Sequence, residues 1–210
     1  ADEATVARLP DDELRAWELL AKGPVDLECA NMDDRALSKA LARLERKGLV
    51  IYSGFTPSDA AHVLGMSNHW NTEAAIFGAR IWARQMRHLY GLGTWVLGDA
   101  LAPSRQVVDK VIDTICQKLI EAGLNDAGQM NEGNANKMAA LLTQMALHHR
   151  IAGTGPAAVF NLQFASGVPL VAVGAPAASY YPRVAQGLGV QLVMPPHAEV
   201  ANAVGAVLGQ

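Results

Sequence analysis

Three small residues near the carboxyl end of the chain could let a phosphate group approach the backbone closely. Gly174, Ala175 and Pro176 follow an apolar run, 168–173, and precede a segment of helical character, 177–188. A turn of small residues between a strand and a helix exposes helix N–H groups at the carboxyl end of the strand, where α/β sheets bind ligands. The pattern therefore suggests anion or nucleotide binding. A purely structural turn is the alternative.

A second pair of residues could hold a metal ion or relay a proton. Thr56 and Pro57 are typical of a helix start, and Asp59 and His62 then lie three residues apart on one face of that helix. The structural alternative is that Asp59 complements the helix N-terminus while His62 is a partly buried polar residue. Two ligands fall short of the three or four of a protein metal site, so the metal stays unassigned.

The glycine pair Gly153 and Gly155 is a weaker candidate for a phosphate-binding loop. Glycines let backbone N–H groups approach an anion. This segment, however, lacks the lysine of a P-loop and the third glycine of a dinucleotide-binding motif, and no clear strand precedes it.

The elements that would position these residues begin with an amino-terminal helical unit, 1–54. Apolar spacing predicts a helix over about 11–22, a second one over about 35–47 and a short strand at 49–52, which is typical of a winged-helix unit. In a DNA-binding interpretation, the basic residues would contact phosphates or bases. These residues are Arg35, Lys39, Arg43, Arg46 and Lys47.

The charge of this region argues against DNA binding. Residues 1–60 hold eight Lys or Arg and twelve Asp or Glu, a net charge of −4. DNA binding depends mainly on a positive surface that neutralises phosphates. We therefore expect a structural or interaction unit and no nucleic-acid partner. A winged-helix regulator with a ligand-sensing α/β domain remains the alternative.

The rest of the chain, 55–210, reads as central helices followed by a strand, a helix, a second strand and a closing helix. Helical periodicity runs over about 72–90 and from Pro103 to about 122, and the second strand is expected at 190–196. The fold class is therefore mixed α/β and helix-rich, with two domains, 1–54 and 55–210.

Composition is that of a globular chain without a membrane segment. Half of the 210 residues are hydrophobic, enough for one good core and a small additional domain. No apolar run approaches the roughly 20 residues that span a bilayer, and no secretory signal opens the chain, so a cytoplasmic protein is expected. Cys29 and Cys116 form no CxxC pair, which indicates neither a disulfide framework nor a cysteine metal site.

Three segments, in this order, resemble the carboxyl-terminal half of the hydantoinase A and 5-oxoprolinase family. They are RLERKGLV at 43–50, GFTPSDAAHVLG at 54–65 and VAVGAPAASYYPRVAQGLGVQLVMPPHAEVANAVGAVLG at 171–209. Members resemble ATP-dependent cyclic-amide hydrolases built on the duplicated fold of actin, sugar kinases and heat-shock ATPases. The resemblance therefore implies a βαβα half of an actin-like ATPase fold, with ATP and Mg²⁺ as cofactors of a complete protein.

The resemblance also assigns residues. It implies that Gly174, Ala175 and Pro176 lie beside phosphate or adenosine. On the closing segment it implies nucleotide contacts for Asn202 and Gly205. Pro196, His197 and Glu199 would lie near the same cleft, with the substrate or metal side as a second possibility for His197 and Glu199.

The same resemblance makes Asp59 and His62 candidates for the substrate or metal side. Residue chemistry leaves simpler roles open, because His197 and Glu199 could cap the closing helix. Asn202 can offer both a donor and an acceptor. The catalytic residues stay unassigned.

One departure from the family limits what the chain can do alone. The glycine-rich acidic Asp-x-Gly-Gly-Thr motif of complete members does not occur, and the sequence begins at Ala1 without methionine. We therefore expect a domain or a truncated relative that needs the missing amino-terminal half or a partner subunit. Such a chain would contribute to ATP-coupled hydrolysis or activation of a small cyclic amide, with little turnover by itself. A non-catalytic structural subunit is a further alternative.

Overall fold

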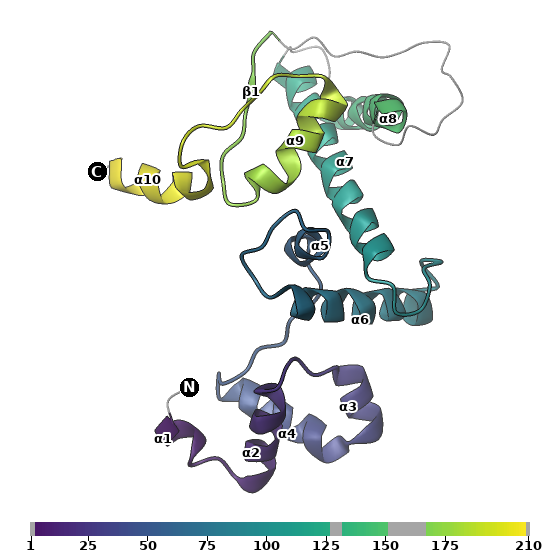
Figure 1. The fold of residues 1–210 in the computed structure, drawn as a ribbon. Helices are drawn as coiled ribbons and strands as arrows, with labels where there is room; N and C mark the ends of the chain where they lie inside the picture. The colour runs from purple at the N-terminus through teal and green to yellow at the C-terminus, as the bar shows by residue number, and fades with distance from the viewer. Residues whose placement is uncertain (1–2, 127–131, 151–166, 209–210) are drawn as a thin grey trace. The chain divides into compact units, whose positions relative to one another are not determined.

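A computed structural model describes residues 3–126, 132–150 and 167–208 (Figure 1). The chain divides into two compact units. Unit 1 comprises Ala1–Val63 and Asn68–Pro103, and unit 2 comprises Leu64–Ser67 and Ser104–Gln210. The boundary expected at residues 54 and 55 therefore falls inside unit 1.

The described residues are predominantly helical. In unit 1 the helices are α1 (Glu3–Val6), α2 (Asp11–Leu20), α3 (Leu27–Asp33), α4 (Arg35–Arg46), α5 (Pro57–Val63) and α6 (Thr72–Tyr90). The remaining elements are α7 (Leu101–Asp126), α8 (Glu132–Arg150), β1 (Leu170–Val171), α9 (Ala177–Leu188), β2 (Leu192–Val193), the 3₁₀ helix η1 (Ala198–Val200) and α10 (Ala201–Leu208).

Helices α2, α3 and α4 enclose a small core at the amino-terminal end of unit 1. Its buried centre consists of Ala16, Ala30, Ala40, Leu41 and Leu44, against which Trp17 and other apolar side chains pack. The apolar residues of α4 recur at helical spacing and so reach the core together. The two expected helices are confirmed. Helix α3 was not expected.

The strand predicted at 49–52 does not form, so that prediction was wrong. Residues 49–56 are irregular, and Ile51 and Tyr52 are exposed. A strand needs a hydrogen-bonded neighbour, and the described part of this helical module offers none. The module is thus helical and lacks a wing within residues 3–56.

Helix α6 confirms the helix expected at 72–90. The Asn71 side chain caps its start by accepting a hydrogen bond from the Ala74 N–H at 3.0 Å. Gly91 ends it in the left-handed conformation, at φ 62°. Caps of both kinds satisfy backbone groups that the helix leaves unpaired.

Unit 2 has a core built mainly from helices. On α7 the buried side chains of Val108, Ile112 and Cys116 recur at helical spacing. Helix α9 buries Tyr180 and Val184 and packs against α8. Burial of these apolar stripes accounts for the association of the helices.

The sheet of unit 2 is a short parallel pair. Leu170 lies opposite Leu192 and Val171 lies opposite Val193, with α9 as the crossover between the strands. The strand, helix, strand and helix order expected from the sequence is present. Each strand, however, has only two residues instead of the six or seven expected.

The mixed, helix-rich class is therefore confirmed, whereas the described residues do not form the βαβα half of an actin-like fold. They contain a single two-stranded sheet. A pair of strands with no third strand beside it is only marginally stable. The described residues supply one neighbour to each strand.

Within the described ranges, no helix is both long enough and apolar enough to cross a membrane.

Candidate functional site

The Gly174 turn joins the carboxyl end of β1 to the start of α9. Gly174 adopts φ 109°, a conformation that favours glycine, and a Cβ there would meet nothing closer than the Pro176 Cδ at 3.9 Å. The turn is closed by the Ala177 N–H, which donates to the Gly174 carbonyl at 3.0 Å. The sequence places glycine here because the backbone conformation requires it.

A backbone hydrogen bond brings this turn against the segment that follows β2. The Gly174 N–H donates to the Ala198 carbonyl at 2.6 Å. The two segments, 174–176 and 197–199, are thus neighbours at the carboxyl ends of the two parallel strands. Sequence reasoning did not identify Ala198 as part of this site, because a main-chain carbonyl has no signature in residue type.

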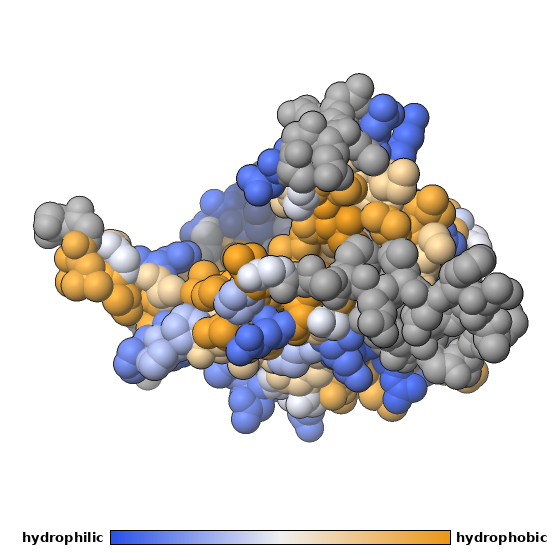
Figure 2. Space-filling model, turned by 90° about the horizontal axis from the view of Figure 1, so that it is seen from above, coloured by the Kyte–Doolittle hydropathy of each residue, from blue (hydrophilic) through white to orange (hydrophobic). Residues whose placement is uncertain are grey.

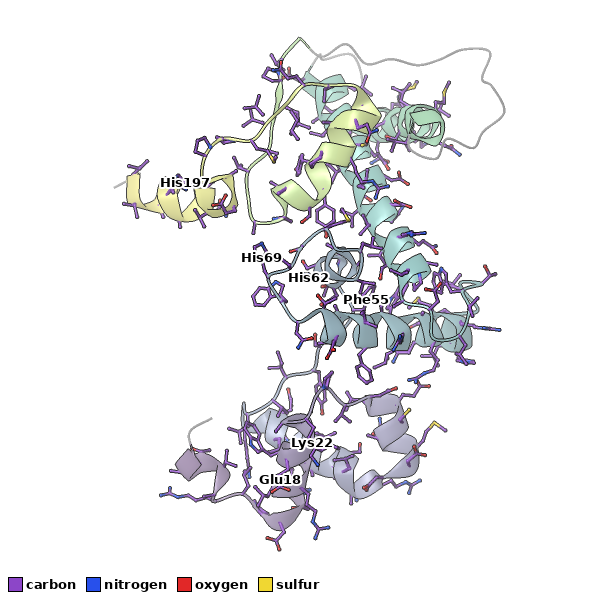
Figure 3. All side chains as sticks on the ribbon, viewed as in Figure 1. Glu18, Lys22, Phe55, His62, His69 and His197 are labelled. Carbon is purple, nitrogen blue, oxygen red and sulfur yellow. The ribbon has the colours of Figure 1, made fainter. Side chains whose placement is uncertain are left out.

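His197 has an unusual backbone conformation at the start of η1. Its φ of 62° makes it the one residue other than glycine with positive φ in the described part of the chain. Its side chain makes no capping hydrogen bond to η1. His197, labelled in Figure 3, and Glu199 are both exposed. Conformations of this kind carry strain and often mark functional turns.

Helix α10 carries the other predicted nucleotide contacts. Asn202 and Gly205 are exposed, as are Ala175 and Pro176 in the turn. None of the eight residues of α10 is buried. These predicted residues are therefore accessible, and the hydrogen bond described above brings the Gly174 turn to the segment that leads into α10.

The chemistry available at this turn comes mainly from the backbone. Helix α9 has twelve residues, and its amino-terminal end faces the turn with a partial positive charge. No Lys or Arg occurs in 174–176 or 197–205, and Glu199 contributes a negative charge. The arrangement can receive an oxyanion or a ribose hydroxyl on one side. Full neutralisation of a triphosphate needs cations from elsewhere.

Asp59 and His62 occupy unit 1, on α5. The Asp59 Oδ2 accepts hydrogen bonds from the Thr56 N–H at 2.8 Å and from the Thr56 hydroxyl at 2.6 Å. Asp59 thus holds the start of its helix, in a reciprocal arrangement in which the Asp59 N–H donates to Thr56 Oγ1 at 3.3 Å.

Both ring nitrogens of His62 are engaged with the backbone. The Nδ1 lies 2.7 Å from the Ser58 carbonyl, and the Trp70 N–H donates to Nε2 at 3.0 Å. A neutral ring with its proton on Nδ1 satisfies both partners. The residue is 3 % exposed, and its side chain ties α5 to the loop before α6. Figure 3 labels His62 on α5. These contacts are those of a structural histidine.

The described residues offer few further candidates for a metal-binding or phosphate-binding site. No group of three or more His, Cys, Asp or Glu side chains in that part of the chain could hold a metal ion. Gly153 and Gly155 lie outside the described residues.

The basic face of α4 is partly neutralised by acidic residues of α2. Glu13, which is 2 % exposed, accepts hydrogen bonds from the Arg43 Nε at 2.9 Å and from the Lys47 Nζ at 2.5 Å. Asp12 also pairs with Arg43. Two of the five basic residues considered for DNA contact therefore hold the module together, which disfavours the winged-helix regulator.

The hydrogen bond from Lys47 lowers the pKa of Glu13, burial raises it, and the hydrogen bond from Arg43 lowers it. As a result, the pKa of Glu13 lies below its ordinary value of 4.5. From the sequence alone, no role was assigned to Glu13. The signal in the sequence that could have predicted this pairing is the spacing of Arg43 and Lys47, which are four residues apart and so lie on the same face at the end of α4.

Comparisons of this chain with models of protein families, with curated proteins and with solved structures found no match.

Proposed function

We propose that this chain is the carboxyl-terminal domain of a hydantoinase- or oxoprolinase-like protein and contributes one wall of a nucleotide site. The whole protein would couple ATP to hydrolysis or activation of a cyclic amide. The observation that supports this most directly is the hydrogen bond from Gly174 to the Ala198 carbonyl, 2.6 Å long. It joins the turn that the family resemblance places beside phosphate or adenosine to the segment that leads into α10, where the resemblance assigns contacts to Asn202 and Gly205.

The turn fits part of a nucleotide. Gly174 leaves open space for close approach, and the α9 N-terminus favours negative charge there. The exposed amide of Asn202 can donate to and accept from a ribose or base. When bound, ATP would supply the phosphoryl group that activates the amide. This chain's own residues would bind and orient one side of it.

The residues present do not fit a magnesium ion. The carboxylate nearest the turn in sequence, Glu199, has no acidic neighbour within 174–205. Mg²⁺ binds through carboxylate oxygens, substrate phosphates and water.

The missing amino-terminal half, or a partner subunit in its place, would complete the site. In support of such a partner, α10 is apolar and unburied: Val204 is 42 %, Val207 75 % and Leu208 78 % exposed. Figure 2 shows this apolar stretch at the left of the view. Exposed apolar surface of this kind is typical of interaction sites.

Calorimetry tests the proposal. ATP or ADP with Mg²⁺ is titrated into the chain alone and then with an amino-terminal half that carries the Asp-x-Gly-Gly-Thr motif. We expect weak or no binding alone and saturable binding after complementation. Absence of nucleotide binding in the complemented sample would overturn the proposal.

A matched pair of glycine variants locates the site. Gly174→Ala places a side chain at φ 109°, whereas Gly48→Ala does so at φ 67° in the amino-terminal module, where space is also open. Only the first should weaken nucleotide binding, by about tenfold if one backbone contact is lost. If Gly174→Ala and Asn202→Ala both leave activity of the complemented protein unchanged, the non-catalytic structural subunit is the better interpretation.

A further inference from the structure

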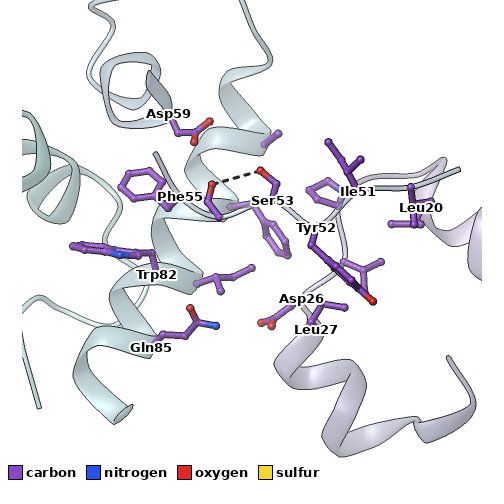
Figure 4. A pocket seen from close by; sticks show the side chains of 18 of the residues that line it. Leu20, Asp26, Leu27, Ile51, Tyr52, Ser53, Phe55, Asp59, Trp82 and Gln85 are labelled. Atoms are coloured by element: carbon purple, nitrogen blue, oxygen red, sulfur yellow. Dashed lines mark hydrogen bonds between the residues drawn. The ribbon is translucent and has the colours of Figure 1, made fainter. Parts of the chain in front are cut away.

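Unit 1 contains a cavity of about 450 Å³ that is lined by none of the residues proposed to contact the nucleotide. Its walls come from the α2–α3 connection, from residues 50–55 and from one side of α6 (Figure 4). This volume lies within the range of small-molecule sites in proteins. The cavity is therefore large enough for an organic ligand.

One wall is aromatic and held in place. The ring centroids of Phe55 and Trp82 lie 5.6 Å apart with an interplanar angle of 39°, and the ring of Trp95 lies 5.4 Å from that of Trp82. Phe77 and Ile81 extend the apolar surface along α6. A flat apolar body would have extended contact with this wall.

A glycine in the middle of α6 keeps the cavity open. Gly78 is less favourable in a helix interior than alanine, because it loses more backbone freedom on folding. A Cβ at this position would meet Phe55 Cδ2 at 3.7 Å, an ordinary contact. Gly78 lines the cavity, so a longer side chain there would enter the space.

The polar groups of the cavity are acidic or neutral. Asp26 and Asp59 line it, and none of its described lining residues is Lys, Arg or His. Asp26 is already paired with Arg84 at 2.6 Å. Asp59 uses Oδ2 for both bonds from Thr56, and Oδ1 takes no hydrogen bond from the described residues. One carboxylate oxygen thus remains for a ligand.

We propose that this cavity binds a small organic cation of the arylalkylamine class. The ammonium group would lie at Asp59 Oδ1, and the aromatic body would lie along Phe55 and Trp82, which also attract cations through their ring faces. This assignment rests on unit 1 alone and does not depend on the proposed nucleotide site.

Three probes of similar shape and different charge test the assignment by calorimetry at neutral pH. They are phenethylamine, phenethyl alcohol and phenylpropanoate. We expect the amine to bind about tenfold more tightly than the alcohol, and the carboxylate to bind most weakly. Equal binding of amine and alcohol, or no binding of the amine, would overturn the proposal.

Variants separate the charge from the shape of the cavity. Asp59→Asn keeps an acceptor for Thr56 but removes the charge, so the preference for amine over alcohol should disappear. Gly78→Leu should weaken binding of both at least tenfold, by filling the space. Asp109→Asn, at an exposed carboxylate of unit 2 paired with Arg183, is the control and should change neither.

The result for each variant either supports or contradicts the proposed amine site. Persistence of the amine preference in Asp59→Asn, or undiminished binding in Gly78→Leu, contradicts the proposed site. Circular dichroism of each variant verifies folding. If Asp59→Asn does not fold, the Gly78→Leu titration and the three-probe series on the native chain still decide the question.

Discussion

The helical module α2–α4 and the closing helix α10 use apolar residues in opposite ways. Leu44, on α4, is completely buried, whereas Leu208, on α10, is 78 % exposed. The module also buries a carboxylate, Glu13, between two basic partners. The buried apolar centre of the module comes from its own helices. Helix α10 is as apolar as a buried helix, but none of its residues is buried. The proposed function therefore includes a partner that would cover it.

Removal of the Leu44 side chain should produce the largest change in stability. Leu44→Ala leaves a cavity in a small core that has few residues to rearrange, so we expect a loss of about 2–5 kcal/mol in the free energy of unfolding. Urea denaturation followed by Trp fluorescence measures it, because Trp17 packs on this core. A loss below about 1 kcal/mol would mean that the module is not the closed core described.

The two cysteines differ in exposure: Cys29 is exposed and Cys116 is buried. Burial, together with the charge of Asp113, raises the pKa of Cys116 to about 12, from an ordinary 9.0. Its thiolate fraction at pH 8 is then roughly a thousandfold lower than that of an ordinary thiol. A hydrogen bond to Asp26 also raises the pKa of Cys29, but that thiol is exposed.

A maleimide should therefore modify Cys29 alone in the native chain and both thiols in urea. Mass spectrometry after timed labelling measures this. In Cys29→Ser the native chain should show no rapid labelling. Rapid labelling of that variant would show that the α7 core opens readily.

Acid should weaken the module through Glu13. Because the folded-state pKa of Glu13 is lowered, its ion pairs stabilise the fold above pH 4.5, and this contribution is lost as the pH falls through the folded-state pKa. Glu13→Gln should be less stable than the native chain at pH 7, and the difference should shrink below pH 4.5. Denaturation midpoints at several pH values measure it.

Glu18 provides the control on the same helix. It is exposed (Figure 3) and forms no ion pair with the described part of the chain. Glu18→Gln should change neither the stability at pH 7 nor its decline in acid. Equal effects of the two substitutions would argue that α2 interacts through its general charge rather than through the buried carboxylate.

Local patterns allowed much of the helical architecture to be predicted. The expected helix 177–188 has the same first and last residues as α9. The spacing of apolar residues correctly predicted the positions of α4 and α6. Such signals are contained within one helix. Helix α3 was missed because it is short, although Asp26 at its start was an available capping signal.

Contacts between distant residues could not be predicted in the same way. The apolar run at 49–52 has strand composition but no described strand beside it. The partners of His62 include a backbone N–H eight residues away, at Trp70. Likewise, the meeting of Gly174 with Ala198 depends on the parallel pairing of β1 with β2. Each of these features depends on tertiary structure that residue type does not encode.

The smallest expected effect is at the closing helix. Leu208→Ala should change the stability of the isolated chain by less than about 0.5 kcal/mol, because the side chain is already mostly in water. A leucine-to-alanine substitution that is costly at Leu44 should therefore have almost no effect on stability at Leu208. The same urea denaturation experiment measures both variants. A loss above about 1 kcal/mol would indicate that α10 is packed in solution, for example in a dimer, which its concentration dependence would reveal. With a complementing partner present, Leu208→Ala should weaken association, because only then does this leucine lose contact with water.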